Sequence, residues 1–316
     1  MPAKWRLSII PLVWVKISAS GNNFHPRFAA MPDTALRPFS IRIFVPGGDP
    51  DGLRLVEKSN WTGIGVVFSR SNFKEAVSRP EVSKTGVYVL VGSADDSALP
   101  MIYVGEGDPV KERLAQHQQK KDFWDWAVFF ATKDDSLNKA HVQHLESRLC
   151  DLARAAKQCK LDNLQTPTSP TLSEAERADV ESFLLDVLSI FPLLGLGVFE
   201  HPGADQRRSD RQVLRVSARG VHGAGYEDAR GFVVCKGTEV AGDEVPSIHQ
   251  YLVSLRADLR ASGVIAEQGG KLIFTQDYVF GSPSTAAGVI LGRSANGREL
   301  WKADDGRTLK QIQATE

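Results

Sequence analysis

Residues 86 to 163 contain the kinds of side chain that phosphodiester chemistry requires. Cleavage of such a bond needs a base that activates water, a cation on the non-bridging oxygens, and help for the leaving oxygen. Tyr88 and Tyr103 offer phenols, Arg113 and His117 offer a guanidinium and an imidazole, and Glu146 offers a carboxylate. If the fold gathers these groups, they could converge on one phosphate.

Two predicted strands carry the tyrosines. Gly86–Val91 and Met101–Gly105 are rich in β-branched and aromatic residues, and a polar loop separates them. This pattern predicts a neighbouring antiparallel pair, with Tyr88 on one strand and Tyr103 on the other.

A predicted helix over Asp108–Gln119 carries the cationic residues, since an acidic capping residue precedes Pro109 at its start. Arg113 and His117 are four residues apart and therefore project from one face of this helix. Lys120 extends the same face, which makes it a candidate for substrate binding.

Glu146 lies on a second, longer predicted helix. Apolar residues recur in this segment at alternating three- and four-residue spacing, so the helix presents one apolar stripe to a sheet. The stripe consists of Val142, Leu145, Leu149, Leu152 and Ala156.

Gly86-Val87-Tyr88 and Tyr103-Val104-Gly105 resemble the two name-giving motifs of the GIY-YIG nuclease family. Both carry valine where the family name has isoleucine, which is a conservative departure. The segment from residue 110 to 117 is similar to the family's basic helix. Glu146 matches the family's metal-binding glutamate, and Asn163 stands where the family keeps a late asparagine. These elements cover about a quarter of the chain.

The resemblance implies a role for each residue. Tyr88 would be the general base or a relay for the attacking water, and His117 would help by taking the phenol's proton, since an isolated phenol titrates near ~10. Tyr103 would position a phosphate or water, and Arg113 would neutralise charge on the phosphate. Glu146 would hold a single Mg²⁺ or Mn²⁺. For Asn163, two roles stay open: to orient a ligand or to support the fold beside the site.

Taken singly, several of these residues have ordinary structural explanations. A strand tyrosine usually packs against its neighbours, and Glu146 could be an exposed carboxylate. His141 and His144 form an H-x-x-H-x-E string with Glu146, but helical geometry spreads the three residues, which argues against zinc. We expect both histidines on a solvated flank or against a DNA backbone. The aromatic run over residues 123–131 is expected to be a strand that contributes to the core, and the alternative is that its rings stack on nucleic-acid bases.

Composition limits the class of protein. The chain has 316 residues, and its 38 Lys and Arg balance 38 Asp and Glu, so any grip on DNA must come from a local basic face. Its 3 cysteines have no CxxC spacing, which suits reduced thiols in the cytoplasm. No apolar run predicts a membrane span. Residues 4–20 only loosely imitate a signal peptide, and both Met1 and Met31 remain possible starts.

The predicted fold class is α+β. Residues 1–38 are expected to be a poorly structured extension, and residues 39–200 a GIY-YIG domain whose small antiparallel sheet is flanked by helices and preceded by a supporting hairpin. Residues 201–223 are the predicted linker, and residues 224–316 a smaller α+β accessory domain. Arg207, Arg208 and Arg211 in the linker are candidates for binding DNA phosphates.

Residues 224 to 312 resemble an uncharacterised domain often found behind GIY-YIG domains. Two strings in this segment, residues 282–287 and residues 296–302, are also similar to the domain associated with restriction-enzyme adenine methylases. By analogy, this implies an accessory that reads DNA or senses its modification.

The leading hypothesis is a metal-dependent DNA endonuclease of defence or restriction type. Two alternatives remain open. One is a degenerate nuclease domain that binds nucleic acid without cutting it, and the other is a repair nuclease that acts on branched or damaged DNA.

Overall fold

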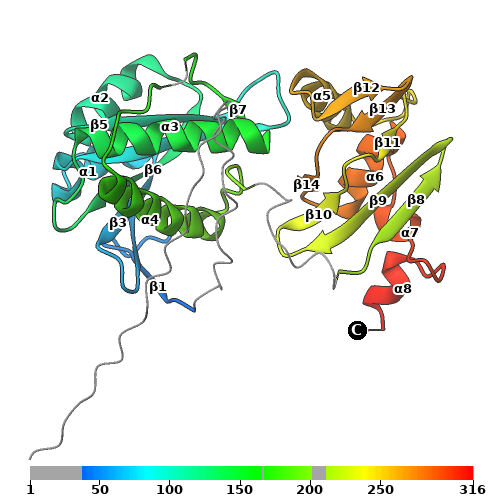
Figure 1. Cartoon of the computed structure of the whole chain (residues 1–316), viewed down its shortest axis with the longest axis horizontal. Helices are drawn as coiled ribbons and strands as arrows, with labels where there is room; N and C mark the ends of the chain where they lie inside the picture. Colours follow the sequence, from blue (N-terminus) through cyan, green and yellow to red (C-terminus); the bar gives the residue numbers. More distant parts are fainter. Residues whose placement is uncertain (1–37, 166, 201–210, 316) are drawn as a thin grey trace, which may run out of the picture. The chain divides into compact units, whose positions relative to one another are not determined.

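The computed structural model describes residues 38–165, 167–200 and 211–315. The predicted N-terminal extension therefore lies, except for its last residue, outside the described residues. The described part is mixed α+β, as expected from the sequence (Figure 1).

A seven-stranded sheet organises the first part of the chain, in the order β1-β2-β3-β6-β4-β5-β7. Neighbouring strands are antiparallel except for β5 and β7, which are parallel. The sheet is thus larger than the small sheet that we expected, because the N-terminal hairpin joins it instead of standing beside it. The strands are β1 Ile41–Phe44, β2 Arg54–Lys58, β3 Gly63–Ser69, β4 Gly86–Ser93, β5 Pro100–Gly107, β6 Trp124–Thr132 and β7 Lys160–Leu161.

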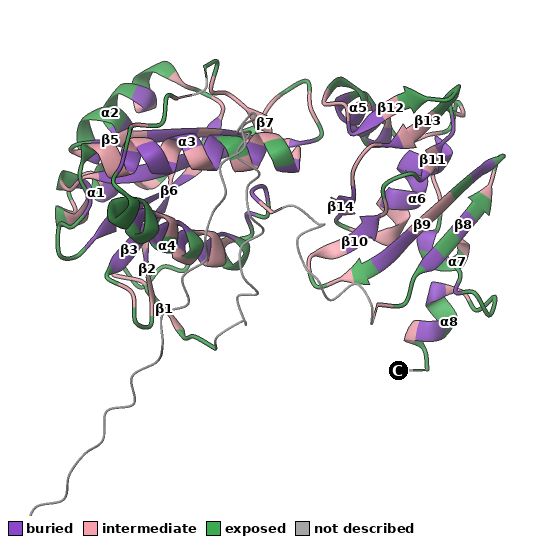
Figure 2. Cartoon of the chain, viewed as in Figure 1, coloured by how far each residue is buried: buried purple, intermediate pink, exposed green. Residues whose placement is uncertain are grey.

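Helices cover both faces of this sheet. Strand residues alternate between two cores: Val87 and Val89 of β4 belong to a core with α3 and α4, whereas Tyr88 and Leu90 belong to a core with α2. In Figure 2, the strands between these helices are largely buried. The helices are α1 Phe73–Ala76, α2 Val110–Lys120, α3 Lys139–Ala156 and α4 Glu174–Ile190, with 3-10 turns η1 Arg70–Asn72, η2 Pro80–Ser83 and η3 Phe191–Leu194.

Two predicted helix caps have different outcomes. The capping box of Ser173 and Glu176 is present at the start of α4. The predicted cap of α2 is wrong, because Pro109 holds the N-cap position and Asp108 accepts a hydrogen bond from the Thr85 hydroxyl at 2.7 Å instead.

The aromatic strand β6 is confirmed as a core element. Trp124 is 1% exposed, and Phe129 and Phe130 are fully buried. Base stacking by these rings would require their removal from the core.

The last hundred or so described residues form two further sheets, one of four strands in the order β14-β10-β9-β8 and one of three in the order β11-β13-β12. The four-stranded sheet contains β8 Leu214–Ala218, β9 Val221–Asp228, β10 Gly231–Val234 and β14 Tyr278–Phe280. The three-stranded sheet contains β11 Glu239–Val240, β12 Ile265–Gln268 and β13 Lys271–Phe274. The helices are α5 Gln250–Ala261, α6 Pro283–Leu291, α7 Gly297–Leu300 and α8 Leu309–Gln313.

Turn residues explain part of this region. The predicted hairpin is present: β12 and β13 pair up to Gln268 and Lys271, and Gly269 and Gly270 both adopt the positive φ that such a two-residue turn requires. The predicted turn at Asn296-Gly297 is instead the beginning of α7.

The predicted linker over residues 201–223 is too long. Residues 201–210 lie outside the described part, but β8 and the first residues of β9 occupy positions 214–223. The alternating apolar residues of β8, Leu214 and Val216, are each 2% exposed, and this strand pattern is obscured by the arginines around it. None of the helices in the described residues has the length and apolarity of a membrane span.

Candidate active site at the tyrosine strands

The antiparallel register of β4 and β5 brings the two tyrosines together. Tyr88 pairs with Gly105, and Tyr103 pairs with Leu90, so the tyrosines are diagonal neighbours on one face of the sheet. Their ring centroids are 6.3 Å apart. The predicted antiparallel pair is therefore present.

His117 projects from α2 against both phenols. Its ring centroid lies 4.7 Å from that of Tyr103 and 5.9 Å from that of Tyr88. Burial, followed by the positive charge of Lys121, lowers the pKa of His117 to about 4. Neither ring nitrogen has a hydrogen-bond partner among the described residues. The imidazole is thus neutral near pH 7 and a weak proton acceptor, which disfavours the role predicted for it.

Tyr88 is fully buried, and its hydroxyl has no hydrogen-bond partner in the described part of the chain. Burial raises the pKa of Tyr88 well above its usual value, and the neighbouring Tyr103 raises it further. The phenol therefore keeps its proton near neutral pH. A hydrogen-bond donor role fits this environment better than the predicted role of a free base.

Tyr103 is more accessible than Tyr88. Burial is the largest cause that raises its pKa, and the charge of Glu146 is the second. Lys121 lies over its ring, with Nζ 4.2 Å from the centroid, and also forms an ion pair with Asp162. Sequence reasoning missed Lys121 and Asp162, since the only signal was the adjacent pair of lysines at the end of α2.

Glu146 is a partly buried carboxylate on α3. Burial is the largest cause that raises its pKa to about 7, and the charge of Glu106 raises it too. Glu106 is itself paired with Lys139 at 2.6 Å. Within the described residues, Glu146 accepts no hydrogen bond and forms no ion pair. A cation beside it would offset the cost of its burial.

Arg113 is an exposed residue of α2 whose guanidinium forms no ion pair within the described residues. Its Nη1 donates to Gln116 Oε1 at 3.2 Å. Its charge lowers the pKa of Tyr88, of Tyr103 and of Glu146, so it lies within electrostatic range of all three. Lys120 is exposed and is the last residue of α2, so the helix does continue to it.

Asn163 supports the strand that carries Tyr103. Its Oδ1 accepts a hydrogen bond from the Val104 amide at 2.9 Å, and its Nδ2 donates to the Val104 carbonyl at 2.7 Å. The side chain thereby continues the β5–β7 pairing beyond Leu161. Of the two roles left open for Asn163, these bonds fit support of the fold.

Of the three arginines predicted to bind phosphates from the linker, one lies within the described residues. Arg207 and Arg208 lie outside the described residues. Arg211 pairs with Asp228 at 2.7 Å, and its guanidinium lies 5.0 Å from the Tyr226 ring centroid. This engagement offers a structural role for Arg211 instead of the predicted phosphate contact.

The expectation that both histidines of the H-x-x-H-x-E string are solvated is wrong for His144. This residue is 6% exposed, and its ring bonds to Ser169 Oγ at 2.9 Å and Glu181 Oε1 at 2.8 Å. His141 instead joins Asn138 in the capping box at the start of α3. Hydrogen bonds to residues outside α3 hold His144, and the spacing along the helix does not contain that information, whereas the bonds of His141 are local to the start of the helix.

The donor set fits a cation that keeps most of its own water. Among the described residues, no three His, Cys, Asp or Glu side chains form a group that could hold a metal ion. Mg²⁺ commonly takes one or two carboxylates and completes its shell with water and substrate phosphate. Glu146, which has no ion pair within the described residues and lies within electrostatic range of Glu106, fits that requirement.

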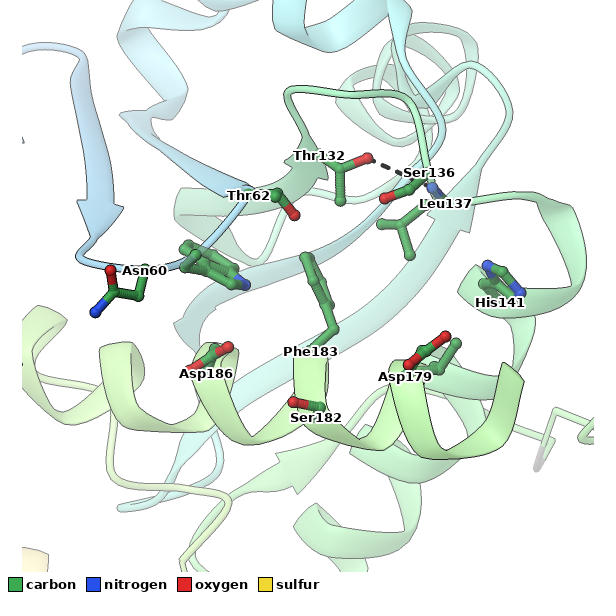
Figure 3. Close-up of a pocket in the computed structure, with 12 residues that line it drawn as sticks. Asn60, Thr62, Thr132, Ser136, Leu137, His141, Asp179, Ser182, Phe183 and Asp186 are labelled. Atoms are coloured by element: carbon green, nitrogen blue, oxygen red, sulfur yellow. Dashed lines mark hydrogen bonds between the residues drawn. The ribbon is translucent and has the colours of Figure 1, made fainter. Parts of the chain in front are cut away.

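A separate cavity of about 320 Å³ lies on the α4 side of the sheet. Figure 3 shows Phe183 and Asp179 of α4 facing Thr62, Thr132 and Leu137 across it. None of the candidate residues Tyr88, Tyr103, Arg113, His117, Glu146 and Asn163 lines this cavity. It is therefore distinct from the tyrosine site.

Comparison with known proteins concerns the other end of the chain. Residues 214–313 match a family described as "Domain of unknown function (DUF4357)". The match begins at β8 and ends at the last residue of α8, so it covers the two smaller sheets and their helices. No curated protein and no solved structure matches the chain.

Proposed function

We propose that this protein is a metal-dependent endonuclease of the GIY-YIG type that hydrolyses phosphodiester bonds in DNA, in a defence or restriction setting. The observation that carries the proposal is the proximity of two phenols, a partly buried carboxylate and a guanidinium that forms no ion pair within the described residues. The charge of Arg113 lowers the pKa of Tyr103 and of Glu146, the charge of Glu146 raises the pKa of Tyr103, and the ring centroids of Tyr88 and Tyr103 are 6.3 Å apart. Simple binding of a phosphate does not require a desolvated carboxylate.

The exposed residues of the site meet the substrate in this proposal. Arg113 binds the non-bridging oxygens of the scissile phosphate, where a guanidinium can donate two parallel hydrogen bonds. Tyr103 orients the same phosphate or the attacking water through its hydroxyl. Lys120 contacts the neighbouring backbone phosphate, as its exposed position at the end of α2 allows.

Two of the buried residues, Tyr88 and His117, each keep one protonation state near neutral pH. Tyr88 stays protonated, so its hydroxyl, which has no partner among the described residues, can donate a hydrogen bond to water or substrate. His117 stays neutral and packs against Tyr103. Glu146 would hold the divalent cation. When bound, Mg²⁺ or Mn²⁺ would supply Lewis-acid stabilisation of the charge that develops on the phosphate.

The test is nicking of supercoiled plasmid by the full chain in Mg²⁺ or Mn²⁺. We expect Glu146→Gln and Arg113→Ala each to reduce nicking by about a hundredfold or more, the scale for loss of one charged transition-state contact. Lys111→Ala, an exposed cation on the same helix, is the matched control and should retain activity.

The outcome also separates the competing functions. DNA binding without cleavage of linear, nicked, supercoiled or branched substrates would replace the enzyme with a nucleic-acid-binding protein. Cleavage confined to branched DNA would instead indicate a structure-specific repair nuclease.

A further inference from the structure

A second groove, of about 390 Å³, lies in the region that matches the family of unknown function. Its lining residues come from the β8–β9 hairpin and from the turn that follows β10. The charged or titratable side chains along it are Arg215, His222 and Lys236, and among its described lining residues there is no carboxylate. The groove therefore suits an anionic ligand.

The turn after β10 places Lys236 at the rim. The Thr238 amide donates to the Cys235 carbonyl at 3.2 Å, and Gly237 adopts φ 86°, so Lys236 and Gly237 are the central residues of the turn. The Lys236 amide donates to Asp277 Oδ1 at 2.8 Å, which fixes its backbone. Its ammonium group has no partner among the described residues, so its donors remain available.

The floor of the groove depends on a close approach between strands. A Cβ at Gly223 would lie 2.5 Å from Thr238 Cγ2, so only glycine leaves room for this side chain. Thr238 in turn accepts a hydrogen bond from the Ala224 amide at 3.1 Å. This packing holds the turn with Lys236 beside β9.

His222 and Arg215 are also held in place. Ser217 Oγ and His222 Nδ1 are 3.0 Å apart, across the paired positions of β8 and β9. Arg215 Nε donates to Asp304 Oδ1 at 2.8 Å, which leaves its two terminal nitrogens without a bond in the described residues. Within the described residues, Asp304 is the carboxylate that pairs with Arg215 and would compete with an anion for it.

We propose that this groove binds the phosphodiester backbone of DNA. Arg215 lies on β8 and Lys236 lies on the turn after β10, and both side chains are exposed. Two basic groups on separate chain segments can contact successive phosphates of one backbone. This inference rests on the proposed function for the identity of the ligand, DNA. The preference for an anion follows from the residues of the groove itself. The groove contacts phosphates and no base edges in this proposal. Its contribution to the binding affinity is therefore independent of DNA sequence and sensitive to salt.

The test measures binding of a fluorescent mixed-sequence duplex by the full chain in a metal-free buffer with chelator, so that cleavage plays no part. Lys236→Ala and Arg215→Ala should each weaken binding about three- to tenfold and reduce the slope of log affinity against log salt by about one. Lys310→Ala, an exposed lysine on α8 outside the groove, is the matched control and should change neither quantity.

Asp304→Asn should change the affinity for the duplex in the opposite direction. Loss of this carboxylate frees the Arg215 guanidinium, so affinity for the duplex should rise about two- to threefold. A merely structural role for the pair would lower affinity or leave it unchanged. Unchanged binding and salt slope in both cation variants would overturn the proposal, as would displacement of the duplex by inorganic phosphate at the same concentration of phosphate groups. Plasmid nicking is scored separately, so either proposal can fail alone.

Discussion

Tyr88 lies directly over Gly105, its partner across β4 and β5, and a Cβ at Gly105 would come within 2.5 Å of Tyr88 Cζ. The glycine of the second motif is thus required by the tyrosine of the first. This relationship explains why the two motifs belong together as a packing unit, apart from any chemistry that they perform.

Gly105→Ala should displace the Tyr88 ring. Because the surrounding core is tightly packed, we expect a loss of about 1 to 3 kcal/mol in the free energy of unfolding, together with loss of plasmid nicking. Gly197→Ala is the matched control, since a Cβ there meets nothing within 4 Å. Urea unfolding of both variants gives the comparison. Equal stability of Gly105→Ala and the wild type would show that the ring moves without cost.

Tyr88→Phe separates stability from activity. The hydroxyl is buried without a partner in the described residues, so its removal should leave stability unchanged or raise it by up to about 1 kcal/mol. Nicking should nevertheless fall sharply if the hydroxyl donates to the substrate or to water. Tyr278→Phe removes another buried, unpartnered hydroxyl and should preserve nicking. Full activity of Tyr88→Phe would exclude the hydroxyl from the reaction.

The sequence was sufficient to predict the strands and helices that carry the site, because their periodicity and turn residues are local signals. It placed Tyr88 and Tyr103 on a neighbouring antiparallel pair, and the register confirms this. It could not predict the burial of Tyr88 or the low pKa of His117, since both depend on how α2 covers the sheet.

Long-range contacts account for the other differences. Nothing in the spacing of His144 indicates that Glu181, on α4, would bond to its ring. Likewise, the arginine-rich composition of the predicted linker concealed β8, whose inward residues are apolar. Local composition describes the exposed face of such an edge strand and underrates its buried face.

Asn163→Ala should destabilise the edge of the sheet. The change removes both hydrogen bonds to Val104 and leaves two backbone groups without their partner, at a cost of about 2 kcal/mol. Thermal unfolding measures this loss. If Asn163 only supports β5, the folded variant should still be stabilised by Mn²⁺ at temperatures below its melting transition. Loss of the metal response with unchanged stability would instead make Asn163 a direct ligand.

His117 should make the protein sensitive to acid. Its pKa falls to about 4 in the folded state from an ordinary value near 6.5, so the unfolded chain binds the proton first as pH falls. The contribution of the neutral His117 to the free energy of unfolding is fully present above about pH 6.5 and is lost as the pH falls towards 4. About 2 kcal/mol of it is lost by pH 5. Denaturant unfolding near pH 7 and near pH 5 should show that His117→Gln escapes this part of the loss. The same pH dependence in both proteins would mean that the imidazole is solvated.

Glu146→Gln should stabilise the protein without metal and abolish its response to metal. Burial raises the pKa of this carboxyl to about 7, so near pH 8 its charge costs folding free energy that the amide does not. Allowing for its partial exposure, we expect a gain of about 1 to 2 kcal/mol. Added Mn²⁺ should raise the melting temperature of the wild type, because the cation binds the carboxylate of the folded protein. The melting temperature of the variant should not change, because the amide carries no charge for the cation to bind. Asp151→Asn, an exposed carboxylate on the same helix, should respond to Mn²⁺ like the wild type. An equal response in wild type and Glu146→Gln would place the cation elsewhere.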